Sequence, residues 1–285
     1  MGLFFRALAL LPLPVLYWLG DGLHVLVFHV VRWRVTLARR NIEGAFPEKS
    51  VAEREGILRD SYRNLCRTLM EAIWGFRAPG QALVDRIAYE NPEVIEHYKA
   101  TGTTLVLLTA HTCNWEWLLL ASGVRFEFPI DAVYKRLALT GVDAYVREAR
   151  SRFGGNPIPF EMFLFELMRR PPQPRAYAMV ADQTPKRKMP KYWTRFLGRD
   201  TAFYLGPEKI ARYLDAPVLY VEMTRAGVGR YSVKFHKLAE PPYDEDSGPM
   251  IAESYARGLE ATVRAHPADW LWVHNKWKYG REVDA

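Results

Sequence analysis

The sequence is poor in cysteine, and it contains no internal repeat and no low-complexity segment. Two cysteines, Cys66 and Cys113, are too few for a disulfide framework, and no Cys-x-x-Cys spacing indicates a zinc site. This usage favours a reducing compartment, and we expect neither a bound metal nor a cofactor. With 285 residues, of which 49% are hydrophobic and 13% aromatic, the chain can bury a substantial core, which excludes global disorder. It is long enough for one sizeable domain or two small ones.

The apolar N-terminal segment 3–31 lacks an unbroken hydrophobic run of about 18 residues, which would be the clear signal of a transmembrane helix. Four polar residues interrupt it: Arg6, Asp21, His24 and His29. A signal peptide over 7–19 would need an A-x-A-like cleavage site, and none follows. The segment is therefore a membrane anchor, or a pair of interfacial helices bent at Pro12, Pro14 and Gly20–Gly22, or a buried core hairpin. A basic cluster follows, which favours membrane attachment at a cytoplasmic face: Arg32, Arg34, Arg39 and Arg40.

The formal net charge of +7 and the sequence pI of about 9.3 indicate an anionic partner. Nucleic acid, anionic lipid and an acidic carrier protein all fit this charge. Against nucleic acid, the sequence has no RNP motif and no zinc-finger spacing, and its basic residues follow membrane-like apolar stretches. We therefore expect no nucleic-acid partner.

Short apolar runs alternate with amphipathic stretches along the rest of the chain. A helix is expected over 47–76, where Ser50 and Glu53 have capping-box spacing and one face is apolar, formed by Leu58, Tyr62, Leu65, Leu69 and Ile73. Strands are expected at 103–110, 129–135, 176–182, 217–223 and 231–239, and further helices at 142–154, at 205–214 and around Ile251–Val263. The pattern predicts an α/β fold with a central, mostly parallel sheet flanked by helices, preceded by an N-terminal membrane-associated helical region.

Two of the buried strands end in polar residues, His111 after the first and Asp182 after the third. Ligand sites in open α/β sheets collect beyond the carboxyl ends of the strands, so these two residues are expected to be neighbours. Glu116, five positions after His111, would lie in the first turns of a helix. There its carboxylate could fix one imidazole nitrogen while the other accepts a proton from an attacking hydroxyl. A polar turn in which His111 only caps the helix is the alternative.

Several ordered signatures extend over almost the whole chain. They are ARRNIEGAFPEKSVAERE (38–55), HTCNWEW (111–117), YK (134–135), REARSRFGGNPIP (147–159), ADQTPK (181–186), FLGRDTAF (196–203) and WLWVHNKWK (270–278). In this order they resemble the lipid A biosynthesis late acyltransferases, of the lauroyl/myristoyl type, within the His-x4-acidic acyltransferase group. Better-known members have a D-Q/H-D-x-G-P-K run and a P-F-F-G box where this chain has DQTPKRKMPKYWTRFLG. This difference in sequence affects the expected identity of the acceptor and the expected length of the acyl chain more than the expected reaction.

The resemblance implies that His111 is the general base and Glu116 its partner. It implies transfer of a fatty acyl group from acyl carrier protein, or possibly from acyl-CoA, to a hydroxyl of a lipid A precursor at the cytoplasmic face of the bacterial inner membrane. Residues 1–35 would then be the membrane anchor or interfacial helices, and 36–285 the acyltransferase domain.

The remaining candidates concern substrate binding. Arg150 or Arg152 would bind an acceptor phosphate or assist an oxyanion, or would lie on a solvated helix face. Asp182 and Gln183 would orient the acceptor or rigidify the site. Lys186 begins a basic loop, with Arg187, Lys188 and Lys191, that either receives lipid phosphate or carrier protein or is only solvated.

Two further residues are competitors for catalysis. His274 lies among aromatic residues and is assigned a structural or acceptor-side role. Cys113 could form an acyl-enzyme, but we expect it to be a small buried residue. Two alternatives to the whole assignment stay open at this point: the same chemistry on another glycolipid, lysophospholipid or amino-acid-containing lipid, and a basic membrane-bound lipid-binding scaffold without activity.

Overall fold

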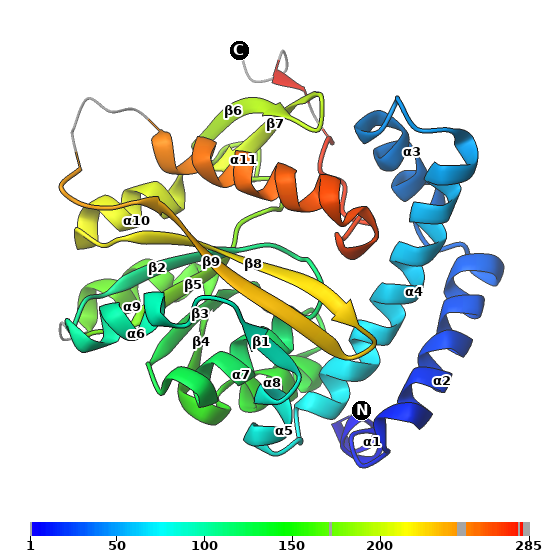
Figure 1. The fold of residues 1–285 in the computed structure, drawn as a ribbon, viewed down its shortest axis with the longest axis horizontal. Helices are drawn as coiled ribbons and strands as arrows, with labels where there is room; N and C mark the ends of the chain where they lie inside the picture. Colours follow the sequence, from blue (N-terminus) through cyan, green and yellow to red (C-terminus); the bar gives the residue numbers. More distant parts are fainter. Residues whose placement is uncertain (1, 171–172, 244–248, 279, 282–285) are drawn as a thin grey trace.

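The computed structural model describes residues 2–170, 173–243, 249–278 and 280–281 (Figure 1). Its centre is a seven-stranded sheet with the order β1-β9-β8-β2-β5-β3-β4. The five strands β8, β2, β5, β3 and β4 run parallel, while β9 is antiparallel to β8 and parallel to β1. The strands are β1 (Ile87–Tyr89), β2 (Leu105–Thr109), β3 (Ile130–Tyr134), β4 (Gly155–Pro159), β5 (Ala176–Val180), β8 (Val218–Gly227) and β9 (Arg230–Ala239). The predicted α/β fold with a mostly parallel sheet is confirmed.

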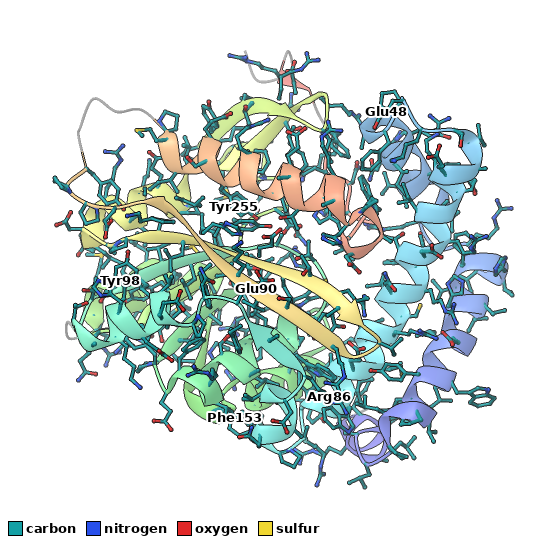
Figure 2. All side chains as sticks on the ribbon, viewed as in Figure 1. Glu48, Arg86, Glu90, Tyr98, Phe153 and Tyr255 are labelled. Carbon is teal, nitrogen blue, oxygen red and sulfur yellow. The ribbon has the colours of Figure 1, made fainter. Side chains whose placement is uncertain are left out.

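Helices cover both faces of this sheet (Figure 1). One layer contains α5 (Gly80–Val84), α6 (Glu93–Ala100), α7 (Trp115–Phe126) and α8 (Thr140–Arg150), and the other contains α9 (Phe163–Arg169), α10 (Gly206–Leu214) and α11 (Met250–Ala265). Because alternate residues of a strand point to opposite faces, β2 contributes Leu105 to one core and Val106 and Leu108 to the other. Tyr255 of α11, labelled in Figure 2, donates to the carbonyl of Thr109 at 2.8 Å and so fixes the end of β2.

The N-terminal region packs against the long helix α4 (Val51–Gly75) as α1 (Gly2–Leu8), α2 (Leu13–His24), the π-helical turn η1 (Val25–Val30) and α3 (Val35–Ala45) (Figure 1). The chain bends between α1 and α2, as expected at Pro12, but the expected bend at Gly20–Gly22 is wrong because α2 continues through both glycines. A Cβ on Gly20 would lie 3.3 Å from Met70 Cγ of α4, so glycine permits this close approach. Asp21 pairs there with Arg67 at 2.7 Å.

The expected helix over 47–76 is α4, and its capping box between Ser50 and Glu53 is present. Leu58 and Tyr62 are buried as predicted, but Leu69 is 45% exposed, so its place on the apolar face is wrong. The carboxylate of Glu71 is buried on this helix instead. Glu71 thus lies on the side of the helix where the pattern placed charged, solvated residues, but it is buried.

Four strands were not expected: β1, β4, β6 (Lys191–Phe196) and β7 (Arg199–Tyr204). Two prolines, Pro157 and Pro159, obscure β4, and its place at the edge of the sheet tolerates them because no further strand needs their missing N–H groups. The hairpin of β6 and β7 turns at Leu197–Gly198, both with positive φ, which is the geometry of a two-residue β-turn. Short 3-10 turns complete the fold: η2 (Arg152–Gly154), η3 (Phe160–Met162) and η4 (Pro267–Asp269).

Candidate active site

His111 and Asp182 meet at the carboxyl edge of the sheet. They follow β2 and β5, which pair as parallel neighbours from Leu105 opposite Ala176 to Thr109 opposite Val180. His111 Nδ1 lies 2.7 Å from Asp182 Oδ1. The expectation that strand order makes these two residues neighbours is confirmed.

This hydrogen bond sets the proton position on the imidazole. An ionised carboxylate only accepts, so the neutral ring carries its hydrogen on Nδ1 and leaves Nε2 unprotonated. Burial acts to raise the pKa of Asp182, but the His111 charge and hydrogen bond, with a 2.9 Å bond from Trp270 Nε1, outweigh it and lower the pKa to about 2. Asp182 is therefore ionised throughout the neutral range.

The rest of the imidazole environment is partly open. The side chain of His111 is 19% exposed, Gln183 Nε2 lies 3.4 Å from His111 Nε2, and the Trp115 ring packs edge-on to the imidazole with centroids 5.0 Å apart. The Gln183 amide N–H can donate to His111 Nε2 only if that nitrogen is unprotonated, which agrees with the proton on Nδ1. A reactant can thus approach Nε2 without the core having to open.

Glu116 does not accept a hydrogen bond from His111 among the described residues, and the expected His111–Glu116 bond is replaced by His111–Asp182. Its carboxylate instead accepts from both Arg150 Nε, at 2.8 Å, and Arg150 Nη2, and also from Trp115 Nε1 at 3.1 Å. The physical reason is geometric, because a planar guanidinium fork matches both carboxylate oxygens at once. Arg150 is therefore engaged with Glu116 and is mostly buried.

The turn between His111 and α7 is fixed from two sides. Asn114 is the N-cap of α7, and its side-chain oxygen accepts from the Trp117 amide at 3.0 Å. The C-terminal segment pairs with the same turn, with Cys113 N donating to Asp269 O at 3.0 Å and Leu271 N to His111 O at 3.1 Å. Cys113 is buried, as expected, in a left-handed conformation, and burial raises the pKa of its thiol. A thiolate nucleophile is thereby disfavoured.

Glu71 of α4 was missed by the sequence reasoning, yet four side chains from three other elements converge on it. Its carboxylate accepts from Tyr17 of α2 at 3.0 Å, from Asn114 at 2.9 Å and from Tyr231 of β9, and its backbone carbonyl accepts from Trp117 Nε1 at 2.7 Å. The apolar pattern offered no signal for this residue, because position 71 lies on the charged side of the predicted helix. Glu71 connects the N-terminal helices to the residue that caps α7.

The other sequence candidates have structural partners. Arg152 donates to the carbonyls of Phe76 and Ala78, at 2.7 and 2.9 Å, so it caps the end of α4 rather than facing solvent. His274 Nε2 accepts from the Thr184 amide at 3.1 Å, and burial lowers the pKa of His274 to about 4. A nitrogen already used as an acceptor has a structural role. Lys186 is exposed.

Lys276 is a buried cation behind this site. Its Nζ donates to the Ala202 carbonyl at 3.1 Å and lies 4.0 Å from the centre of the Phe203 ring. Desolvation lowers the pKa of Lys276 to about 7, although the Asp182 charge acts to raise it. No pattern in the sequence predicts that this lysine is buried.

The depressed pKa of Lys276 predicts how stability varies with pH. Between about pH 7 and 10.5 the unfolded chain binds a proton that the folded chain has released, so the free energy of unfolding rises with pH across this window. Lys276→Met, which removes the titrating group, is expected to flatten that rise. Urea unfolding at pH 7, 8.5 and 10 measures it, and equal slopes for wild type and variant would contradict the assignment.

The fold and this site define an α/β protein with a His–Asp pair suited to general-base catalysis, and the comparisons with known proteins identify its class. The family model of bacterial lipid A biosynthesis acyltransferases matches residues 2–279. The chain belongs to this family and is an acyltransferase.

Three curated relatives are similar to this chain. A lipid A biosynthesis palmitoleoyltransferase of Escherichia coli (strain K12) and a lipid A biosynthesis acyltransferase of Shigella flexneri are each 22% identical over 94% of this chain and 86% of their own length. A lipid A biosynthesis lauroyltransferase of Escherichia coli (strain K12) is 29% identical over 37% of this chain and 35% of its own length. The family assignment removes the alternative of a scaffold without activity.

Proposed function

We propose that this protein transfers a fatty acyl group from an acyl carrier protein thioester to a hydroxyl of a lipid A precursor. The observation that carries the mechanism is the 2.7 Å contact between His111 Nδ1 and Asp182, which leaves Nε2 as a proton acceptor. Family membership and the relatives' names support lipid A as the acceptor class.

In this mechanism His111 Nε2 takes the proton of the acceptor hydroxyl as its oxygen attacks the thioester carbonyl. The new C–O ester bond forms, the C–S bond breaks, and the proton passes from the imidazolium to the departing thiolate. Asp182 holds the imidazole in the required tautomer and stabilises the transient positive charge. Glu116 and Arg150 act beside it, because Glu116 holds Trp115, whose ring packs against His111.

An acidic carrier protein as the donor fits the charge of the chain, and the anionic acyl-CoA fits it as well. The net charge of +7 favours an acidic partner, and Lys186, Arg187 and Lys188 form an exposed basic stretch that begins four residues after Asp182. The same stretch also fits anionic lipid headgroups.

The direct test is a transfer assay with purified protein, an acylated carrier protein or acyl-CoA, and a lipid A precursor, followed by mass spectrometry of the lipid. Formation of one additional ester with the carrier-bound donor supports the proposal. An ester formed only on lysophospholipid would assign a different acceptor. Mass spectrometry of lipid A from cells without the gene identifies which acyl chain is missing.

We place the N-terminal helices at the cytoplasmic face of the inner membrane. Leu13–Val30 is long and apolar enough to cross a bilayer. However, one face packs on α4 through Leu16 and Tyr17, while Leu10, Trp18 and Val30 are 69–75% exposed. A helix with one protein-packed face and one exposed apolar face fits a position in the membrane interface.

Point substitutions test this attachment better than truncation, because deletion of 1–31 would also remove the buried Leu16 and the Tyr17–Glu71 bond. Leu10→Glu with Trp18→Glu is expected to move much of the protein from the pellet to the supernatant with anionic vesicles. Each large apolar side chain that enters an apolar phase contributes about 1.5–3 kcal/mol. Tyr213→Glu, an exposed residue of α10 across the molecule, is the matched control (Figure 1). Full pelleting of the double variant at high salt would contradict the assignment.

A further inference from the structure

Arg199 is a half-buried cation at the start of β7. The Leu197–Gly198 turn places it opposite Phe196 in the hairpin. Its guanidinium carbon lies 4.3 Å from the centre of a Trp277 ring, and Trp277 Nε1 in turn donates to Thr201 Oγ1 at 2.8 Å. A stacked guanidinium keeps its N–H edge available for a ligand.

The other side of Arg199 contacts α3. A Cβ added at Gly44 would lie 2.9 Å from Arg199 Nη1, so the guanidinium rests directly against this glycine. Arg40 is four residues before Gly44, on the same face of α3. Burial and then the Arg40 charge lower the pKa of Arg199, which agrees with two like charges held close together.

Neither arginine has an acidic partner in the described part of the chain, where the ion pairs include none for Arg40 or Arg199. Their neighbour Arg39 differs, because it pairs with Glu55 through two bonds, at 2.5 and 3.0 Å. Two adjacent cations without a counter-ion repel each other, and this repulsion is relieved when a phosphate anion binds between them.

The arginine pair connects to the reaction centre by a series of four contacts. His111 bonds to Asp182, Asp182 accepts from Trp270 Nε1 at 2.9 Å, and Trp270 packs against Trp277 with ring centroids 6.2 Å apart. The Arg199 guanidinium in turn stacks on the Trp277 ring. The C-terminal segment that bonds to Asp182 through Trp270 therefore also contacts Arg199 through Trp277, which links the arginine pair structurally to the reaction centre.

We propose that Arg40 and Arg199 form a binding site for a phosphate monoester or phosphodiester of a substrate. A phosphate monoester carries about −1.5 to −2 charges at pH 7 and offers three oxygens to two guanidinium forks. The identity of the substrate rests on the proposed function, which provides two sources of this chemistry. One is a phosphate on the lipid acceptor, and the other is the phosphopantetheine of the carrier protein.

Binding is tested first without acyl transfer, with inorganic phosphate as the probe. Phosphate is expected to raise the melting temperature of the wild type above that in sodium chloride of equal ionic strength, because a ligand of the folded state stabilises it. Arg40→Gln and Arg199→Gln should lose this shift. Arg125→Gln, at the far end of α7, removes one charge elsewhere and should keep it. No shift in the wild type, or an equal shift in Arg40→Gln, overturns the proposal; Arg40 is exposed, so this variant should fold.

Gly44→Ala tests whether phosphate binding depends on the position of the Arg199 guanidinium or only on the net charge of the protein. It keeps every arginine, and alanine suits a helix interior better than glycine, but its Cβ would lie 2.9 Å from Arg199 Nη1, so the guanidinium has to shift from its present position. The phosphate-dependent shift should shrink in this variant as well. An unchanged shift would mean that the charges act only through the general field of the protein, which overturns the built site.

Kinetics then identify the source of the phosphate. If it belongs to the acceptor, Arg40→Gln should raise the KM for the acceptor about tenfold with kcat nearly unchanged, because the site binds without taking part in the chemistry. A rise in the KM for the carrier-bound donor assigns phosphopantetheine. If neither KM changes, the proposal is overturned. Phosphate binding without any acyl transfer would refute the proposed function and leave the site intact.

Discussion

Replacing His111 by alanine is expected to abolish nearly all acyl transfer while the protein remains folded. General-base catalysis contributes about 10²–10⁴-fold, and no other described side chain presents an unprotonated imidazole nitrogen at this edge of the sheet, since His274 Nε2 is already an acceptor. His111 is 19% exposed, but its truncation also removes a hydrogen bond from the buried carboxylate of Asp182, so the variant should fold with a measurable loss of stability. Initial rates and urea unfolding of the same preparation measure both effects.

Cys113→Ala is the control for this experiment. Cys113 lies two residues from His111 but is buried, with a thiol pKa well above its usual value, so activity should be retained. A loss of less than threefold in His111→Ala would refute the general-base assignment. A stable thioester on Cys113 would replace direct transfer by a two-step mechanism.

The sequence predicted the part of the site that depends on topology. His111 and Asp182 each end a buried strand, and the rule that sites form beyond the carboxyl ends of parallel strands was enough to bring them together. The same reasoning gave the sheet and its main helices. These features follow from local apolar patterns, and a single sequence contains such patterns directly.

The partner of Glu116 could not be predicted in this way. Short spacing paired it with His111, but the helix begins at Trp115 after the left-handed Cys113, and the carboxylate bonds to Arg150, 34 residues away on α8. Glu71 and the stacked Arg199 were missed for the same reason. Each depends on contacts between distant segments, and no periodicity encodes them.

The chain thus has two candidate orienting carboxylates, and one pair of substitutions distinguishes them. Asp182→Asn is nearly isosteric and can keep the bond from Trp270, but its amide can donate to His111 Nδ1. That would favour the tautomer with hydrogen on Nε2, which cannot accept a proton. We expect kcat to fall about 10³–10⁴-fold with little change in stability, as expected when the tautomer is wrong.

Glu116→Gln should behave differently. It weakens the paired bond with Arg150 and the hold on Trp115, but leaves the proton on His111 Nδ1. The fall in kcat should be smaller for Glu116→Gln than for Asp182→Asn. ¹⁵N NMR of the imidazole should show a tautomer change only in Asp182→Asn. If Glu116→Gln alone shifts the tautomer, or if Asp182→Asn keeps activity within threefold, Asp182 is not the residue that orients His111. The short spacing in the sequence would then have identified the correct partner despite the bond that Asp182 makes.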